Sequence, residues 1–142
     1  MTRADIVTAA RLWIGTPYRH QAATRGAGCD CLGLLRGVWR HLYGDEPLAV
    51  PPYRANWRDD RHVGALRAAA DALLVPAVGE MRPGQVLLFR LGRMSAPKHC
   101  GIATDAGRFV HAQEGLGVIE GNLTDGWARR VAARYDFPGV ND

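Results

Sequence analysis

The chain is predicted to adopt an α+β fold, with N-terminal helices packed on an antiparallel β-sheet formed by its second half. Apolar residues recur at helical spacing in the first half, and after Pro76 this period gives way to short apolar runs between turn residues. The chain has 142 residues, 47% of them hydrophobic, which is enough for one core. No repeat, linker or low-complexity segment divides it, so residues 1–142 are expected to form a single domain.

The first predicted helix covers residues 3–14. Thr2 can cap its start, and Gly15 ends it. Its core-facing residues are expected to be Ile6, Ala9, Ala10 and Trp13. A loop is expected over residues 16–29.

Two further helices are predicted before the sheet. One covers residues 31–43 and stops at Gly44, with an apolar stripe formed by Leu35, Val38, Trp39 and Leu42. Residues 45–58 contain three prolines and no periodicity, which predicts an extended surface segment. The next helix is expected over residues 61–74, with Val63, Leu66, Ala70 and Leu73 facing the core.

The second half is expected to supply the sheet. Turn residues separate apolar runs that are typical of strands, and a short helical piece is expected around residues 125–129. The predicted strands are residues 85–91, 99–104, 108–112, 117–120 and 131–137.

Cys31 lies where the second helix begins, and stepping back four residues from Leu35 along the stripe reaches it. Backbone N–H groups in the first turn of a helix have no intrahelical partner, and together with the helix dipole they favour a negative charge there. Asp30 can serve as the N-cap. A thiol in this position can react as a thiolate, although a small buried hydrophobe is the alternative interpretation.

Two of the five histidines fall on predicted strands joined by a short hairpin. His99 and His111 can therefore be neighbours across the ladder, while His41 and His62 are expected to be solvated and His20 is ambiguous. A thiol at a helix start and an imidazole on a sheet are what thiol-based acyl transfer requires, with a second polar group to orient the ring.

A zinc site is the alternative for this set of side chains. The possible ligands are Cys29, Cys31, His99, Cys100 and His111. However, a C-x-C pair is tighter than the usual zinc knuckle, and adjacent residues of a strand point to opposite faces. We therefore expect no metal and no other cofactor. With three cysteines, a disulfide framework is not expected either.

The net charge of +4 comes from 17 arginines and one lysine against 14 acidic residues. Genome base composition can account for this excess, and a mildly basic surface also suits an anionic partner such as a cell wall. The arginines are scattered and not interleaved with aromatic residues, so nucleic acid is not an expected partner. Neither a signal peptide nor a transmembrane segment is expected.

Five segments in order resemble the NlpC-type papain-like cell-wall peptidases. They are residues 15–19 (G-T-P-Y-R), 30–34 (D-C-L-G-L), 82–89 (R-P-G-Q-V-L-L-F), 98–102 (K-H-C-G-I) and 109–112 (F-V-H-A). The resemblance covers most of the chain, and the two histidines are twelve residues apart, as in that family. Leu32 and Gln85 stand where the family has Ser and Asp, and Cys100 replaces an apolar residue and is expected to be an inert core thiol.

The resemblance implies a papain-like NlpC fold and a role for each matching residue. Cys31 would be the nucleophile, His99 the general base and acid, and His111 the residue that orients His99. Tyr18 would lie beside the cysteine and contact the substrate or the oxyanion region, where Asp30 is also placed. Backbone N–H groups at the start of the Cys31 helix would supply part of an oxyanion hole.

The substrate implied by the resemblance is the peptidoglycan stem peptide, often cut between D-γ-glutamate and diaminopimelate. Without an expected signal peptide, the chain resembles the subset found in phage tails and gene-transfer particles. It would be made in the cytoplasm and act in the periplasm or wall of a target cell, with residues 45–58 and the arginine-rich tail docking to tail or baseplate proteins. Two alternatives stay open: a catalytically silent tail adaptor, and an acyltransferase or deamidase acting on cytoplasmic proteins.

Overall fold

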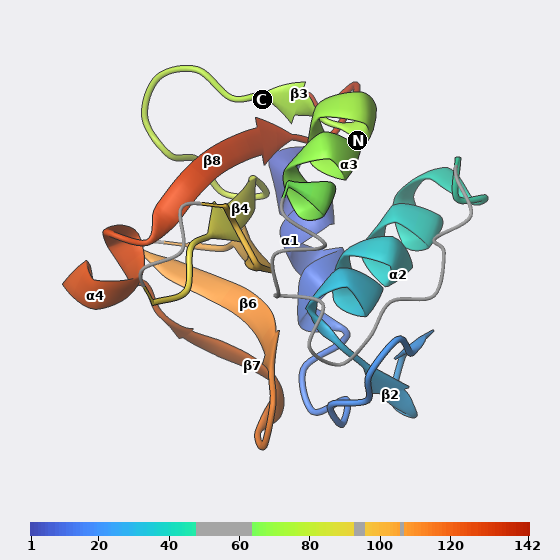
Figure 1. Cartoon of the computed structure of the whole chain (residues 1–142). Coiled ribbons are helices and arrows are strands. Elements are labelled where there is room, and N and C mark those ends of the chain that lie inside the picture. The colour runs from blue at the N-terminus through green and yellow to red at the C-terminus, as the bar shows by residue number, and fades with distance from the viewer. Residues whose placement is uncertain (48–63, 93–95, 106) are drawn as a thin grey trace.

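The computed structural model describes residues 1–47, 64–92, 96–105 and 107–142 (Figure 1). Its helices are α1 (Arg3–Arg11), α2 (Cys31–Tyr43), α3 (Ala65–Leu73) and the short α4 (Asp125–Ala128). The strands that form the main sheet are β3 (Val75–Pro76), β4 (Val86–Phe89), β5 (His99–Ala103), β6 (Arg108–Gln113), β7 (Gly117–Asn122) and β8 (Val131–Asp136). Two more strands, β1 (Ala23–Thr24) and β2 (Gly28–Cys29), form a separate hairpin.

The main sheet has six strands in the order β3-β8-β4-β5-β6-β7, and every neighbouring pair is antiparallel. Figure 1 shows α1, α2 and α3 gathered to one side of this sheet, while α4 lies at its opposite side next to β8. The predicted α+β architecture, with N-terminal helices on a C-terminal antiparallel sheet, is therefore confirmed.

Both faces of the central strands are buried. One face packs against the helices in the larger core, which contains Ile6, Leu34, Val38, Ile102 and Val110 among others. The other face carries a smaller core formed by Leu87, Phe89, Ala103 and Phe109, with Leu123, Trp127 and Val131 packed against it. Successive strand residues point to opposite faces, so a strand buried on both sides is continuously apolar, as β4 is.

Several predicted boundaries were wrong by a few residues. The first helix ends at Arg11 instead of residue 14, because residues 12–14 turn away with Trp13 N–H donating to the Ala10 carbonyl at 3.1 Å. The third helix begins at Ala65; residues 61–63, including Val63, and most of the predicted extended segment lie outside the described residues. The strands β1, β2 and β3 were not predicted, since two residues leave no periodic pattern.

The buried face of α2 is rotated from the predicted stripe. Leu34 and Val38 are fully buried, whereas Leu35, Trp39 and Leu42 only flank the core. Gly33 and Gly37 cause the rotation. The Ala22 carbonyl packs against Gly33 and the Trp13 ring packs against Gly37, each in the space that a Cβ atom would occupy. Among the described residues, no helix has the length and apolarity needed to cross a bilayer.

Candidate active site

Asp30 fixes the start of α2, as predicted for an N-cap. Its Oδ1 accepts a hydrogen bond from Gly33 N–H at 2.7 Å, and its Oδ2 accepts one from Gln21 N–H at 2.8 Å. The carboxylate therefore ties the preceding loop to the first turn, where it is 2% exposed. A carboxylate cannot donate a hydrogen bond to an oxyanion, so Asp30 contributes by positioning Cys31, the next residue. A direct role of Asp30 in substrate binding stays a prediction.

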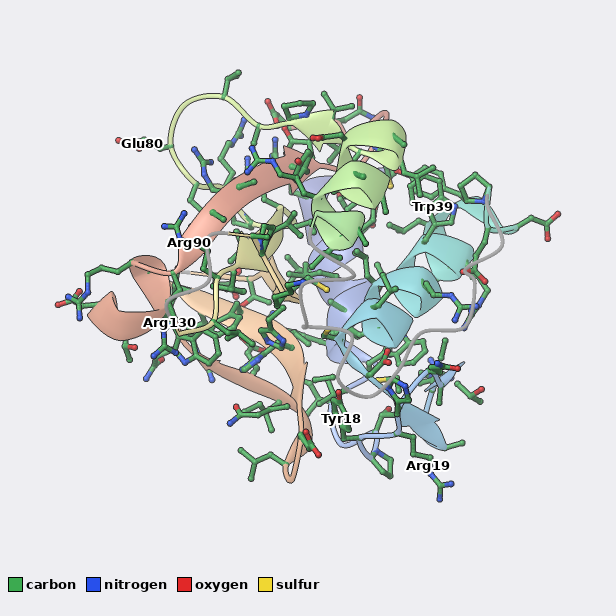
Figure 2. The ribbon with its side chains drawn as sticks, viewed as in Figure 1. Tyr18, Arg19, Trp39, Glu80, Arg90 and Arg130 are labelled. Carbon is green, nitrogen blue, oxygen red and sulfur yellow. The ribbon has the colours of Figure 1, made fainter. Side chains whose placement is uncertain are left out.

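Tyr18 is held beside β2, the strand that precedes α2. Its backbone forms a parallel bridge with Cys29, in which Cys29 N–H donates to Pro17 O and Arg19 N–H donates to Cys29 O, each at 3.0 Å. Figure 2 shows Tyr18 below the start of α2, and its side chain packs against the edge of the larger core. The bridge places Tyr18 opposite Cys29, two residues before Cys31, and its contact with substrate stays a prediction.

Cys31 is the first residue of α2 and is 3% exposed. A hydrogen bond from the Cys100 thiol, a second from the His99 imidazole and the positive charge of His99 hold the pKa of Cys31 well below its usual range. Burial and the Asp30 carboxylate oppose this shift without cancelling it. Cys31 therefore has the surroundings of a thiolate, and the interpretation as an ordinary buried hydrophobe is disfavoured.

The thiols of Cys29 and Cys100 are expected to stay protonated. Burial, followed by the charge of Asp30, raises the pKa of Cys29 to about 12. The hydrogen bond with Cys31, together with burial, raises the pKa of Cys100 well above its usual range, and its thiol lies 3.2 Å from the Cys31 carbonyl oxygen. Cys100 is a buried core thiol as expected, but it also contacts the nucleophile, which the sequence did not predict. All three cysteines are free.

His99 and His111 meet on neighbouring strands, as the hairpin predicted. Nε2 of His99 lies 2.9 Å from Nδ1 of His111, and the two side chains are almost fully buried. Because Nε2 of His99 faces His111, the Nδ1 atom is left for the hydrogen bond with Cys31. The three predicted site residues therefore form one chain of contacts, Cys31–His99–His111.

His111 is neutral at ordinary pH, because burial and the charge of His99 lower its pKa to about 3. The Nδ1 atom of neutral His111 can accept a hydrogen bond from the Nε2–H group of His99, which fixes the orientation of the His99 ring. His41 is exposed on α2, as predicted, and His20 is exposed in the loop, 3.9 Å from Asp30. His62 lies outside the described residues.

Aromatic rings enclose the two imidazoles. Phe109 stacks on His111 with centroids 4.2 Å apart, and Trp127 of α4 lies 5.2 Å from His111 and 5.8 Å from His99. This apolar shell excludes water and so keeps His111 uncharged. Sequence reasoning missed Trp127, because its short helical segment carries no motif and its contacts with the histidines come only from the fold.

The donor atoms of this cluster are arranged for proton transfer. Among the described residues, no group of three or more His, Cys, Asp or Glu side chains is arranged to hold a metal ion. A thiol at a helix start, a buried base and a neutral orienting ring together can attack a carbonyl and return a proton to the leaving group.

Wild-type protein is expected to lose stability as the pH falls from about 6.5 toward about 3, in part because of His111. In this window His111 binds a proton in the unfolded chain but not in the folded protein. The free energy of unfolding therefore decreases as the pH decreases. Urea unfolding between about pH 7 and pH 5 should show a weaker pH dependence for His111→Asn than for wild type. Equal slopes would mean that folded His111 titrates normally.

The fold and this cluster bring together the thiol, base and orienting ring that thiol-based acyl transfer requires. The NlpC/P60 family profile matches residues 15–135, and the chain belongs to this family. Family membership agrees with the motifs found in the sequence.

Two curated relatives come from Escherichia coli strain K12. "Probable endopeptidase NlpC" is 28% identical over 111 residues, covering 78% of this chain and 62% of that protein. "Murein DD-endopeptidase MepS/Murein LD-carboxypeptidase" is 29% identical over 129 residues, covering 86% of this chain and 59% of that protein. The chain thus spans about three fifths of the length of these relatives.

Solved structures show the same fold. The NlpC/p60 domain of the peptidoglycan hydrolase SagA superposes with a TM-score of 0.61 at 24% identity, covering 95% of this chain and 97% of that chain. An NlpC/P60 family protein from Bacillus cereus ATCC 10987 gives a TM-score of 0.66 at 18% identity, covering 96% of this chain and 40% of that one.

Proposed function

We propose that this protein is a cysteine endopeptidase that hydrolyses amide bonds in peptidoglycan stem peptides, with the D-γ-glutamyl-diaminopimelate bond as the expected site. The observation that carries this proposal is the Cys31–His99–His111 chain of contacts in a member of a peptidoglycan hydrolase family. The curated relatives that are named endopeptidases support it, and the family profile matches residues 15–135, a range that includes all three residues.

The chemistry follows from the geometry. The Cys31 thiolate attacks the scissile carbonyl carbon and forms a C–S bond, while the oxygen becomes an anion facing the first-turn N–H groups of α2. The C–N bond breaks as protonated His99 gives its Nδ1 proton to the leaving amine. Neutral His99 then takes a proton from water, the resulting hydroxide attacks the thioester, and the Cys31 thiolate departs. His111 holds the His99 ring throughout.

Purified wild-type protein is expected to convert stem peptides into two products whose combined mass exceeds that of the substrate by one water. Mass spectrometry of muropeptides after digestion of sacculi checks this and locates the bond. Cys31→Ala should release no product, whereas Cys29→Ala should match wild type because Cys29 stays protonated.

Other outcomes of the same experiment favour the alternatives. Cleavage by Cys31→Ala would overturn the proposed mechanism. A catalytically silent adaptor would release nothing, and its Cys31 would react with iodoacetamide no faster than a free thiol. An acyltransferase would yield products joined to an added amine, and a deamidase would leave every chain intact.

We further propose that the enzyme is carried by a phage-like tail that opens the wall of a target cell. The basic composition, which suits an anionic cell wall, supports this setting. Fractionation of particles on a density gradient should recover the protein with tail or baseplate proteins. Its recovery only in the soluble cytoplasmic fraction would contradict this setting and leave the hydrolytic activity unaffected.

A further inference from the structure

Three arginines meet where the end of β4 contacts the end of α4, and we call them the cationic rim: Arg90, Arg129 and Arg130. Arg90 directly follows β4, and the other two follow α4. Arg90 N–H donates to the Arg130 carbonyl at 2.7 Å, and the Arg90 guanidinium donates to the Arg129 carbonyl at 3.4 Å. Figure 2 shows Arg90 and Arg130 on the same side of the molecule, where β8 meets α4.

Trp127 connects the cationic rim to the catalytic histidines. The Arg130 guanidinium carbon lies 5.4 Å from the centroid of the Trp127 ring, and that ring lies 5.8 Å from the ring of His99. The two contacts together span a distance that an extended peptide covers in about three residues. A substrate whose scissile bond lies between Cys31 and His99 can therefore reach the rim with a neighbouring residue.

The three arginines of the cationic rim lack a carboxylate partner among the described residues. Six others make ion pairs with Asp or Glu: Arg3, Arg11, Arg36, Arg40, Arg82 and Arg108. Within the described part of the chain, no carboxylate lies within ion-pair distance of the three rim arginines. Arg129 and Arg130 are exposed, and Arg90 is partly exposed. Like charges held together at the edge of a site favour an anionic ligand.

We propose that the cationic rim is a subsite that binds a free carboxylate of the stem peptide. This inference rests on the proposed function. A γ-linked glutamate keeps its α-carboxylate free, and diaminopimelate carries another, so the expected substrate places carboxylates on both sides of the cut bond. Guanidinium groups bind carboxylates through paired hydrogen bonds, and the Trp127 ring holds Arg130 in place for this. The rim selects peptides whose carboxylates are free over those that are amidated.

The test compares two synthetic stem peptides that differ only in amidation of these carboxylates. Wild type is expected to cleave the free acid with a kcat/KM about ten to a hundred times that of the amide, which is the range of one charged hydrogen bond. Arg130→Gln and Arg90→Gln should lose most of this preference. Their kcat/KM should fall for the free acid and stay unchanged for the amide. Arg25→Gln, in the turn between β1 and β2, removes the same charge from an exposed position away from α4 and should keep the preference.

Binding measured by calorimetry in the Cys31→Ala background separates this inference from the proposed function. Weaker binding of the free acid in the Arg130→Gln protein supports the subsite even if wild type hydrolyses neither peptide, a result that would contradict the proposed function alone. Unchanged affinity and unchanged preference in the rim variants would overturn the subsite. Loss of activity on whole sacculi with normal cleavage of the peptides would also overturn it, because the rim would then bind another wall anion.

Discussion

Replacing His99 with alanine is expected to lower kcat/KM for stem-peptide hydrolysis about a thousandfold or more. His99 acts twice in the proposed cycle, first by stabilising the thiolate and then by protonating the leaving amine. Its hydrogen bond and charge are two of the three interactions that lower the pKa of Cys31. Losing them leaves only the Cys100 hydrogen bond to lower the pKa of Cys31, against burial and Asp30, both of which favour the protonated thiol.

Two measurements check this expectation. Steady-state kinetics gives the loss in kcat/KM, and the pH dependence of iodoacetamide alkylation gives the pKa of Cys31. In His99→Ala the alkylation midpoint should move upward, and the rate at neutral pH should fall. His41→Ala is the matched control, since His41 is exposed on α2 outside the site. A variant that kept a reactive thiol at neutral pH would show that Cys100 and the helix start suffice to ionise Cys31.

The candidate site residues could be found from the sequence because the position of each depends on local structure. Asp30 and Cys31 lie at a helix start that the apolar pattern locates. His99 and His111 lie on strands joined by a short hairpin, which brings them together whatever the rest of the fold does. The five ordered motifs then indicated the family, which the profile match confirms.

The missed features depend on contacts between distant segments. The buried face of α2 was predicted wrongly because glycines contribute little to a hydrophobic pattern. The absence of side chains at Gly33 and Gly37 nevertheless lets Ala22 and Trp13 pack against the helix. The enclosure of the histidines by Trp127 and the contact of Cys100 with Cys31 require the sheet to be assembled first. No periodicity within one segment carries that information.

Replacing Gly33 with alanine is expected to lower the free energy of unfolding by about 3 kcal/mol or more. A Cβ atom at this position would overlap the carbonyl oxygen of Ala22 and lie 2.9 Å from its carbonyl carbon. The obstacle is backbone and cannot rotate away. That same carbonyl accepts the Asp30 N–H at 3.3 Å, and Gln21 beside it donates to the Asp30 carboxylate. Pushing Ala22 outward therefore loosens the cap that places Cys31.

Gly121→Ala in β7 is the matched control. A Cβ atom there meets nothing within 4 Å, and its backbone is not left-handed, so its unfolding free energy should stay within about 0.5 kcal/mol of wild type. Urea unfolding of both variants measures the difference. Iodoacetamide should also alkylate Cys31 more slowly at neutral pH in the folded Gly33→Ala protein, because the start of α2 is then displaced. If both variants unfold like wild type, the loop does not hold the nucleophile, and His99 and Cys100 alone set its position.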